Sequence, residues 1–237
     1  MNLSAIIFCY NEEGSIVNVF KQVHDVLKTF SNDFEVIFVN DGSSDRTKLF
    51  CELIEKEHTF VHLINHESNL GIGMAIKSGY FAATKEYVCA IPGDGQFDVR
   101  EIANIRPFNF KTYYSFYRVQ TNYSTYRKAL TWFNRLFNQH ILGVYLRDVN
   151  WVKVYRIEHL QVVDIELSSS LIESEICAKL YKHKVLPIEV PSMYLTRKSG
   201  VSSGGDWKTL KKAIVELLFL YWVVIKYNPK RKEQVNK

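Results

Sequence analysis

The chain has 237 residues, 47% of them hydrophobic, and a formal net charge of +5. This length and apolar content argue against a disordered chain and predict one large domain, or one domain with an elaborated C-terminal half. The four cysteines form no close pair and no metal-ligand spacing, which argues against a disulfide scaffold or a zinc site and indicates reduced cysteines. Residues 1–10 lack the basic start and long apolar stretch of a signal peptide, so we expect a protein that stays inside the cell.

Charge is distributed in alternating blocks along the chain. Residues 1–105 carry 8 Lys and Arg against 15 Asp and Glu, and residues 106–156 carry 9 against 1. Residues 157–196 carry 3 against 6, and residues 197–237 carry 10 against 3. Such blocks can be solvated surface. Their separation nevertheless suggests two tasks, namely binding a cation in the acidic first block and binding anions or an anionic surface in the basic ones.

The first half alternates apolar, strand-like runs with amphipathic helical patterns. Strands are predicted at 3–9, 34–39, 61–64 and 87–91, and helices at 16–30, 47–57 and 74–83. This alternation predicts an α/β fold with a mostly parallel sheet, flanked by helices and joined by right-handed crossovers. Three polar loops, at 10–13, 41–45 and 94–98, then fall on the same carboxyl edge of the sheet.

The polar loop after the fourth strand carries the candidate metal ligands. Asp94, Gln96 and Asp98 follow a Pro-Gly pair at the end of that strand. Ligands bind at this edge of open α/β sheets, and two or three oxygen donors in a short turn suit a hard divalent cation shared with phosphates. A solvated Asp-Gly turn is the alternative. Gly71 and Gly73 do not form a dinucleotide-binding loop, because the third glycine is missing at the required spacing.

The basic block at 106–156 points to an anionic substrate. A strand is predicted at 113–118 and a helical region at 125–142. A hydroxyl acceptor needs a carboxylate base to remove its proton, whereas a lipid phosphate is already an anion and needs cations, for which the planar fork of arginine is suited. A basic solvated helix face is the alternative. The block supplies Arg106, Lys111, Arg118, Arg127, Lys128, Arg135 and Arg147, with Asp148 as the one acid.

The apolar run from Ala213 to Ile225 is flanked on both sides by basic residues. These 13 residues would form a helix about 20 Å long, shorter than the roughly 30 Å hydrocarbon core, so we expect the segment not to span a bilayer. Its aromatic residues and basic flanks are typical of a helix that lies in the interface of an anionic membrane. A core helix that closes the domain and a homodimer contact are the alternatives.

Four motifs in the first half together resemble those of family 2 glycosyltransferases with the GT-A fold. They are Tyr-Asn-Glu-Glu at 10–13, Val-Asn-Asp-Gly-Ser-Ser-Asp at 39–45, Asn-Leu-Gly-Ile-Gly at 69–73 and Asp-Gly-Gln at 94–96. The resemblance implies a nucleotide-diphosphate sugar donor and a divalent cation, Mg²⁺ or Mn²⁺, held by Asp94 and Gln96. The donor-binding residues that it implies are Tyr10, Asn11, Glu12, Asp41 and Gly71.

Two positions depart from the pattern of this family. Phe8 stands where a proline usually lies two residues before the Tyr-Asn-Glu motif, and Pro92 replaces the first aspartate of the subfamily's Asp-x-Asp-x-Gln motif. The missing carboxylate removes a charge near the metal and the sugar. The oxygen donors that remain are Asp94, Gln96, Asp98 as a third candidate, and the phosphates of the donor itself.

The second half resembles the polyprenyl-phosphate sugar transferases, the dolichol-phosphate mannose synthase group. The resemblance implies that Arg118, at the end of a strand, and Arg127, at the start of a helix, meet the lipid phosphate. It also implies that Arg197 and Lys198 close over the diphosphate of the donor. The catalytic residues would then be Asp94, Gln96, Arg118 and Arg127.

We therefore expect an inverting glycosyltransferase that moves a sugar to a polyprenyl phosphate, either undecaprenyl or dolichyl. One alternative is a transferase to a saccharide hydroxyl in cell-surface polysaccharide synthesis, with Asp148 or Glu175 as the base. The other alternative is a catalytically silent sugar-nucleotide-binding protein, which the proline at position 92 would explain.

The expected organisation has three parts. Residues 1–105 form the nucleotide-sugar and metal-binding half of a GT-A domain, residues 106–205 the acceptor-binding half, and residues 206–237 a C-terminal amphipathic basic helix and tail. The expected partners are the nucleotide-diphosphate sugar, the polyprenyl phosphate and a membrane surface, with the protein peripheral on the cytoplasmic, inner face of that membrane. The sequence leaves open whether the protein forms a homo-oligomer, and nucleic acid is not expected as a partner.

Overall fold

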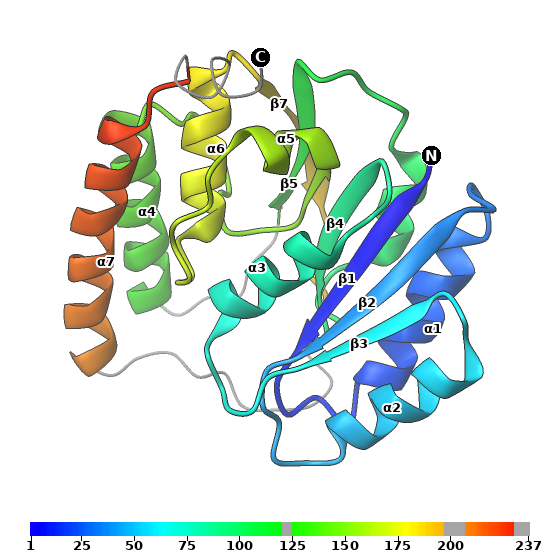
Figure 1. Cartoon of the computed structure of the whole chain (residues 1–237). Helices are drawn as coiled ribbons and strands as arrows, with labels where there is room; N and C mark the ends of the chain where they lie inside the picture. Colours follow the sequence, from blue (N-terminus) through cyan, green and yellow to red (C-terminus); the bar gives the residue numbers. More distant parts are fainter. Residues whose placement is uncertain (120–124, 197–206, 230–237) are drawn as a thin grey trace.

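The computed structural model describes residues 1–119, 125–196 and 207–229, with residues 125–130 and 207–214 described by their backbone only. Figure 1 shows the arrangement of its helices and strands. The first half runs β1 (Leu3–Cys9), α1 (Ile16–Leu27), β2 (Phe34–Asn40), α2 (Thr47–Glu57), β3 (Val61–Asn65), α3 (Ile72–Ala82), β4 (Tyr87–Pro92) and the 3₁₀ helix η1 (Val99–Asn104). The second half runs β5 (Thr112–Arg118), α4 (Thr125–His140), β6 (Lys153–Arg156), α5 (Ile157–Val162), α6 (Ile172–Lys182), β7 (Leu186–Ser192) and α7 (Trp207–Lys226).

The described residues form a sheet of seven strands, in the order β3-β2-β1-β4-β6-β5-β7 (Figure 1). β1 is parallel to β2 and β4, and β2 is parallel to β3. β6 is antiparallel to β4 and β5, and β5 is parallel to β7. The predicted α/β class with a mostly parallel sheet is therefore confirmed. Because the chain runs outward from β1 to β3 and then returns to β4, the strand order reverses between β1 and β4, where open sheets bind ligands.

Helices cover both faces of this sheet. α1 and α2 pack on each other and against β1, β2 and β3, whereas α3 packs against β1, β2 and β4 on the opposite face, as right-handed crossovers require (Figure 1). α3 comes close to β1 at Gly79, where an added Cβ would lie 2.3 Å from Ile6 Cγ2. The buried positions of α1 recur at the helical spacing that the sequence predicts: Ile16, Val19, Phe20, Val23, Val26 and Leu27.

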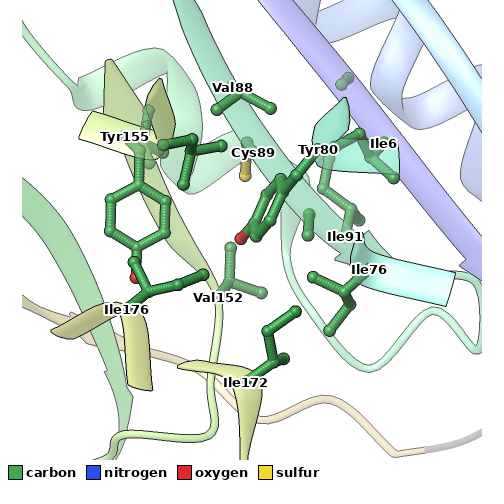
Figure 2. Packing of buried hydrophobic residues seen from close by; sticks show 14 of the residues in the cluster. Ile6, Ile76, Tyr80, Val88, Cys89, Ile91, Val152, Tyr155, Ile172 and Ile176 are labelled. Atoms are coloured by element: carbon green, nitrogen blue, oxygen red, sulfur yellow. The ribbon is translucent and has the colours of Figure 1, made fainter. Parts of the chain in front are cut away.

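The core between α3, β4, β6 and α6 contains a buried polar centre. Figure 2 shows Tyr80 and Tyr155 among apolar side chains that include Val88, Ile91 and Val152. The hydroxyl groups of Tyr80 and Tyr155 donate to the two oxygens of Glu173, at 2.6 and 2.7 Å. Burial is the main reason that the pKa values of both tyrosines are raised well above 10, so both keep their protons and remain donors.

The C-terminal helix α7 is longer than the apolar run from Ala213 to Ile225. It has 20 residues, which correspond to about 30 Å, and it lies within the range 206–237 predicted for a helix and tail. It extends beyond the 13-residue apolar run, so length alone does not argue against a membrane span. Leu220, Val223 and Val224 are buried, and α7 packs against α6. This inward face matches the alternative of a core helix. Within the described residues, no helix combines the length and the hydropathy needed to cross a bilayer.

Hydrogen bonds fix the C-terminal end of α7 on the domain. Lys182 on α6 donates to the carbonyl of Val224 and, at 3.1 Å, to that of Tyr227. The Tyr227 hydroxyl donates to the carbonyl of Val162 at 2.9 Å and lies 2.6 Å from His183 Nε2. The last turn of α7 is therefore part of the folded domain.

Candidate active site

A pocket of about 640 Å³ opens at the carboxyl ends of β1, β2 and β4, at the point where the strand order reverses. We call it the first pocket. Side chains from all three polar loops reach it, which agrees with the prediction that these loops share one carboxyl edge of the sheet. It is lined by Phe8, Cys9, Tyr10, Asn11, Glu12, Asp41, Asn69, Gly71, Ile72, Ala75, Pro92, Gly93 and Asp94.

The loop after β1 is tied to the loop after β2 by several hydrogen bonds. Asn11 has a φ of 55°, a left-handed conformation that asparagine tolerates, and its Oδ1 accepts from the backbone N–H of Ser44 at 2.8 Å. The N–H of Asn11 donates to Ser43 Oγ at 2.9 Å, and the N–H of Glu12 donates to Thr47 Oγ1 at 2.7 Å. Through these bonds, each of the two loops fixes the conformation of the other.

Asp41 lies at the bottom of the first pocket, and its carboxylate is bound by the protein. Oδ1 accepts from the N–H of Leu70 at 2.9 Å, and Oδ2 accepts from the N–H of Gly71 at 2.8 Å. His66 Nδ1 also lies 2.7 Å from Oδ1. The neighbouring Gly42, at a φ of +68°, packs so closely on residue 68 that an added Cβ would lie 2.3 Å from Ser68 C. Asp41 therefore holds the segment at 69–71 against the end of β2.

The loop after β4 sends its polar side chains in different directions. Asp94 lines the first pocket, and its Oδ1 accepts from the N–H of Gln96 at 3.0 Å. Gln96 turns the other way, and its Nε2 donates to the Tyr194 hydroxyl at 2.7 Å. Asp98 accepts two hydrogen bonds from the guanidinium of Arg100, which lower the pKa of this carboxyl. The structure thus brings Asp94 into the first pocket but directs Asp98 away from it.

The oxygen donors of the first pocket fit a cation that is shared with phosphates. Within the described residues, no group of three or more His, Cys, Asp or Glu side chains could hold a metal alone. Pro92, at the position of the missing aspartate, lines the pocket beside Asp94. Mg²⁺ usually binds through one or two protein carboxylates, with substrate phosphates and water completing its coordination. A single carboxylate from Asp94 is consistent with that kind of site.

A second pocket, of about 320 Å³, lies between the end of β5, α4 and α7. It mixes cationic, polar and apolar side chains. Its lining consists of Arg118, Thr131, Phe133, Asn134, Arg135, Leu146, Arg147, Asp148, Val149, Asn150, Ser170, Leu171, Glu216 and Leu217. A ligand with an anionic head and an apolar tail would find partners for both parts in this lining.

Arg118 is held in place at the edge of the second pocket. Its Nε and Nη2 donate to Asp148 Oδ2 and Oδ1, at 2.6 and 2.9 Å. Its guanidinium lies 4.6 Å from the ring centroid of Trp151 and 5.7 Å from that of Tyr194. Because Tyr194 also accepts the hydrogen bond from Gln96, it connects the loop of the first pocket to the arginine of the second.

The two carboxylates considered as general bases are both occupied. Asp148 accepts the two-pronged hydrogen bond from Arg118. Glu175 is fully buried, pairs with Lys179 at 2.6 Å, and accepts from the backbone N–H groups of residues 166 and 167 at 2.8 Å. Glu175 therefore lies in the core, where no substrate hydroxyl reaches it.

Some predicted site residues lie outside what the structure describes. Arg127 is in the first turn of α4, where only the backbone is described, and Arg197 and Lys198 fall outside the described residues. Conversely, Tyr194 and His66 contact predicted site residues but were not themselves predicted from the sequence. An aromatic residue close to the predicted diphosphate-binding basic pair was the available signal for Tyr194, whereas His66 had no motif of its own.

The comparisons with known proteins agree with this geometry. The model of the family described as "Glycosyl transferase family 2" matches residues 4–156, which is more than half of the chain. The chain therefore belongs to glycosyl transferase family 2, as the resemblance of its motifs implied.

Two curated relatives illustrate the range of similarity. "Dolichyl-phosphate beta-glucosyltransferase ALG5A" of Trichomonas vaginalis is 33% identical over 98 residues, which cover 39% of this chain and 30% of the relative. "Undecaprenyl-phosphate 4-deoxy-4-formamido-L-arabinose transferase" of Pectobacterium carotovorum is 26% identical over 207 residues, 85% of this chain and 62% of the relative. The chain thus spans less than two thirds of the length of either protein.

Among solved structures, the fold is similar to that of glucosyl-3-phosphoglycerate synthase from Mycobacterium tuberculosis in complex with Mn²⁺, UDP and phosphoglyceric acid. The TM-score is 0.68 with 12% sequence identity, and the match covers 96% of this chain and 79% of the other. At this identity the likeness concerns the fold, and it confirms the GT-A architecture.

Proposed function

We propose that this chain transfers a sugar from a nucleotide-diphosphate donor to a polyprenyl phosphate. The observation that carries the proposal is the pairing of two pockets: the first with a carboxylate suited to a metal-diphosphate complex, the second with arginines beside apolar side chains. Both curated relatives described above carry names of transferases that act on polyprenyl phosphates, which supports this choice.

The chemistry of the second pocket favours a phosphate over a hydroxyl acceptor. A phosphate oxygen attacks as an anion and needs no base, and Asp148 is engaged by Arg118 instead of facing a substrate proton. Arg135 and Arg147 line the same pocket and add positive charge. Arg127 belongs to the first turn of α4, the helix that also carries Arg135. We expect Arg118 and Arg127 to orient the acceptor phosphate, and the apolar side chains to receive the first part of its tail.

On the donor side, we propose that Tyr10, Asn11, Glu12, Asp41 and Gly71 surround the nucleotide and that Asp94 holds a divalent cation, Mg²⁺ or Mn²⁺. Gln96, the second ligand that the family resemblance implies, donates to Tyr194 in this structure and would have to turn toward the pocket to reach that cation. When bound, this cation would neutralise charge on the departing diphosphate. The acceptor oxygen forms a bond to the anomeric carbon while the bond to the diphosphate breaks, with inversion. Arg197 and Lys198 are proposed to cover the diphosphate.

The outer surface of α7 supports a peripheral position on the cytoplasmic face of a membrane. The exposed apolar residues that form what we call the α4–α7 apolar face are Trp132, Phe133, Val215, Leu218, Phe219, Trp222 and Ile225. Phe133 also lines the second pocket, so a lipid tail could pass from the pocket to this face. The sequence of α7 contains four lysines and one glutamate, and Lys226 Nζ lies 3.3 Å from the Trp222 ring centroid, which suits an anionic bilayer.

A catalytically silent sugar-nucleotide binder is the second candidate, and Pro92 beside Asp94 is the observation that favours it. The test is to incubate the protein with Mn²⁺ and a panel of nucleotide-diphosphate sugars, with and without undecaprenyl phosphate, and to measure both thermal shift and released nucleoside diphosphate. The proposal predicts a thermal shift by one donor and release that depends on the lipid phosphate. A thermal shift without any release would favour the silent binder.

A further inference from the structure

Three polar side chains form a continuous hydrogen-bonded line beneath the first pocket. His66 lies between Asp41 and Ser78: its Nδ1 is 2.7 Å from Asp41 Oδ1, and its Nε2 is 2.9 Å from Ser78 Oγ. Because a carboxylate only accepts, Nδ1 carries the hydrogen, and in that tautomer Nε2 accepts from the Ser78 hydroxyl. The side chains of His66 and Asp41 are only 8% and 5% exposed. The line joins the end of β2, the loop after β3, and α3.

This line ends on backbone groups that shape the pocket. The Asp41 carboxylate, which His66 orients, also accepts from the N–H groups of Leu70 and Gly71. Asn69 and Gly71 line the first pocket, and Gly71 has a φ of +94° as the residue that precedes α3. Two charge-assisted hydrogen bonds therefore hold a segment that is not part of a strand at these residues.

The same hydrogen-bonded line lowers the free energy needed to keep the Asp41 carboxylate charged in a pocket that is proposed to bind anions. The Asp41 carboxylate lines a pocket that is proposed to receive a diphosphate, and two negative groups in one partly buried space repel each other. Donation from one imidazole N–H and two amide N–H groups disperses the charge of the carboxylate. Without His66, Asp41 would lose a buried donor, and both its orientation and the segment at 69–71 would be less fixed.

We propose that His66 is a positioning residue of the nucleotide pocket, which acts through Asp41 on the segment at 69–71 and is itself oriented by Ser78. This role rests on the proposed function, since it concerns how the first pocket receives a nucleotide diphosphate. It also assigns Asp41 a second task beside the donor contact that the family resemblance implies. A purely structural link between β2, β3 and α3 is the alternative that the experiment must separate.

The test compares three variants. His66→Phe keeps the volume and removes both hydrogen bonds, whereas His66→Asn keeps a donor close to the Nδ1 position. His159→Phe is the matched control: His159 is also buried, its Nε2 lies 2.8 Å from the Phe110 carbonyl oxygen, and it lines neither pocket. Each variant is first checked for cooperative unfolding. The first readout is amide hydrogen exchange of a peptide that contains Leu70 and Gly71, which needs no ligand.

The second readout is the dissociation constant for UDP and for GDP in the presence of Mn²⁺. For His66→Phe we expect exchange at residues 70 and 71 to be at least about tenfold faster and nucleotide binding to be about tenfold weaker, the scale of one lost hydrogen bond to a charged group. We expect His66→Asn to recover most of both losses. His159→Phe should change neither quantity.

Unchanged exchange at residues 70 and 71 in His66→Phe would overturn the proposal, because His66 would not hold the segment. Faster exchange with an unchanged dissociation constant would also overturn it and leave a structural link only. If the wild-type protein binds neither of these nucleotides nor any sugar nucleotide of the donor panel, the proposed function fails and the nucleotide role of His66 fails with it. The exchange data would then separate that outcome from a failure of the hydrogen-bonded line itself.

Discussion

Asp94 is the residue on which the donor side of the proposed reaction depends most. It is the carboxylate of the loop after β4 that lines the first pocket, whereas Asp98 is paired with Arg100. Asp94→Ala should reduce turnover by at least about a hundredfold, the scale of removing one strong electrostatic partner of a transition state, with an unchanged circular dichroism spectrum. Asp98→Ala, in the same loop, is the control and should keep most of the activity. Near-normal turnover of Asp94→Ala with Mn²⁺ present would show that this carboxylate is not essential.

Arg118 and Asp148 test the acceptor side together. Arg118→Ala should raise the KM for lipid phosphate tenfold to a hundredfold and leave the KM for the donor nearly unchanged, since a charge-assisted contact is worth about 1.5 to 3 kcal/mol. Asp148→Asn should raise the same KM less and keep kcat within about tenfold, because Asp148 only orients Arg118. Arg100→Ala, outside both pockets, controls for the lost charge. A collapse of kcat in Asp148→Asn would instead identify a general base.

His159 gives a prediction about stability. Burial, opposed by the hydrogen bond to Phe110 and assisted by the positive charge of Arg156, lowers its pKa from near 6.5 to about 4. The folded protein thus binds a proton at His159 less tightly than the unfolded chain does. The contribution of neutral His159 to the free energy of unfolding is therefore present above pH 6.5 and is lost as the pH falls towards 4. Between pH 7 and pH 4.5, wild type should lose about 2 kcal/mol more unfolding free energy than His159→Phe. Urea unfolding measures this difference, and parallel pH curves would contradict it.

At the scale of elements, α7 has two faces with different roles. Leu220, Val223 and Val224 pack inward, whereas Leu218 and Trp222 are 64% and 57% exposed. Truncation of the helix would therefore remove core residues and is a poor test of membrane binding. The double substitution Leu218→Gln and Trp222→Gln changes only the outer face and should weaken sedimentation with anionic liposomes, most clearly at low salt.

The matched control for this liposome experiment is Leu53→Gln on α2, where the side chain is 48% exposed and distant in sequence from the α4–α7 apolar face. Its sedimentation should equal that of wild type. If the α7 double variant also sediments like wild type, or if wild type binds no liposomes at any salt, this face does not dock on membranes. A homodimer contact would then be tested by analytical ultracentrifugation.

Local patterns predicted the elements of the first half closely. α2 begins and ends at the predicted residues, Thr47 and Glu57, because burial on one side imposes a clear periodicity. β1 matches its predicted range because both of its sides are buried, which gives a continuous apolar run. α7 lies within the predicted range 206–237, but the apolar run from Ala213 to Ile225 covers only part of it, since the helix begins at Trp207. A helix can continue through polar residues, so the length of an apolar run does not give the length of the helix.

The candidate site was predictable where it depends on strand ends and less so where it depends on side-chain direction. The sequence indicated that Asp41 and Asp94 meet at one edge, since parallel strands end together. It did not indicate that Gln96 would turn to Tyr194, because the two are 98 positions apart and meet only through the fold. The same holds for the contact of Arg118 with Trp151 and Tyr194.

For the molecule as a whole, the sheet explains why two pockets lie next to each other. The first pocket sits at the reversal of strand order between β1 and β4, and the second lies beyond the end of β5, two strands further along the same sheet. Tyr194 bridges them through Gln96 and Arg118. The predicted division into a donor half at 1–105 and an acceptor half at 106–205 thus corresponds to neighbouring parts of one sheet, and it stays a proposal about function.

The most direct test of the central claim offers the protein two acceptors that differ only in the phosphate. Undecaprenyl phosphate and undecaprenol are incubated separately with Mn²⁺ and the donor that gives the largest thermal shift, and glycosylated lipid is measured by mass spectrometry, with Asp94→Ala as the inactive control. We expect a glycosylated lipid phosphate and no product from undecaprenol, because the arginines of the second pocket suit an anionic acceptor and Asp148 is engaged by Arg118. Transfer to the alcohol or to a saccharide hydroxyl, with none to the phosphate, would contradict this expectation.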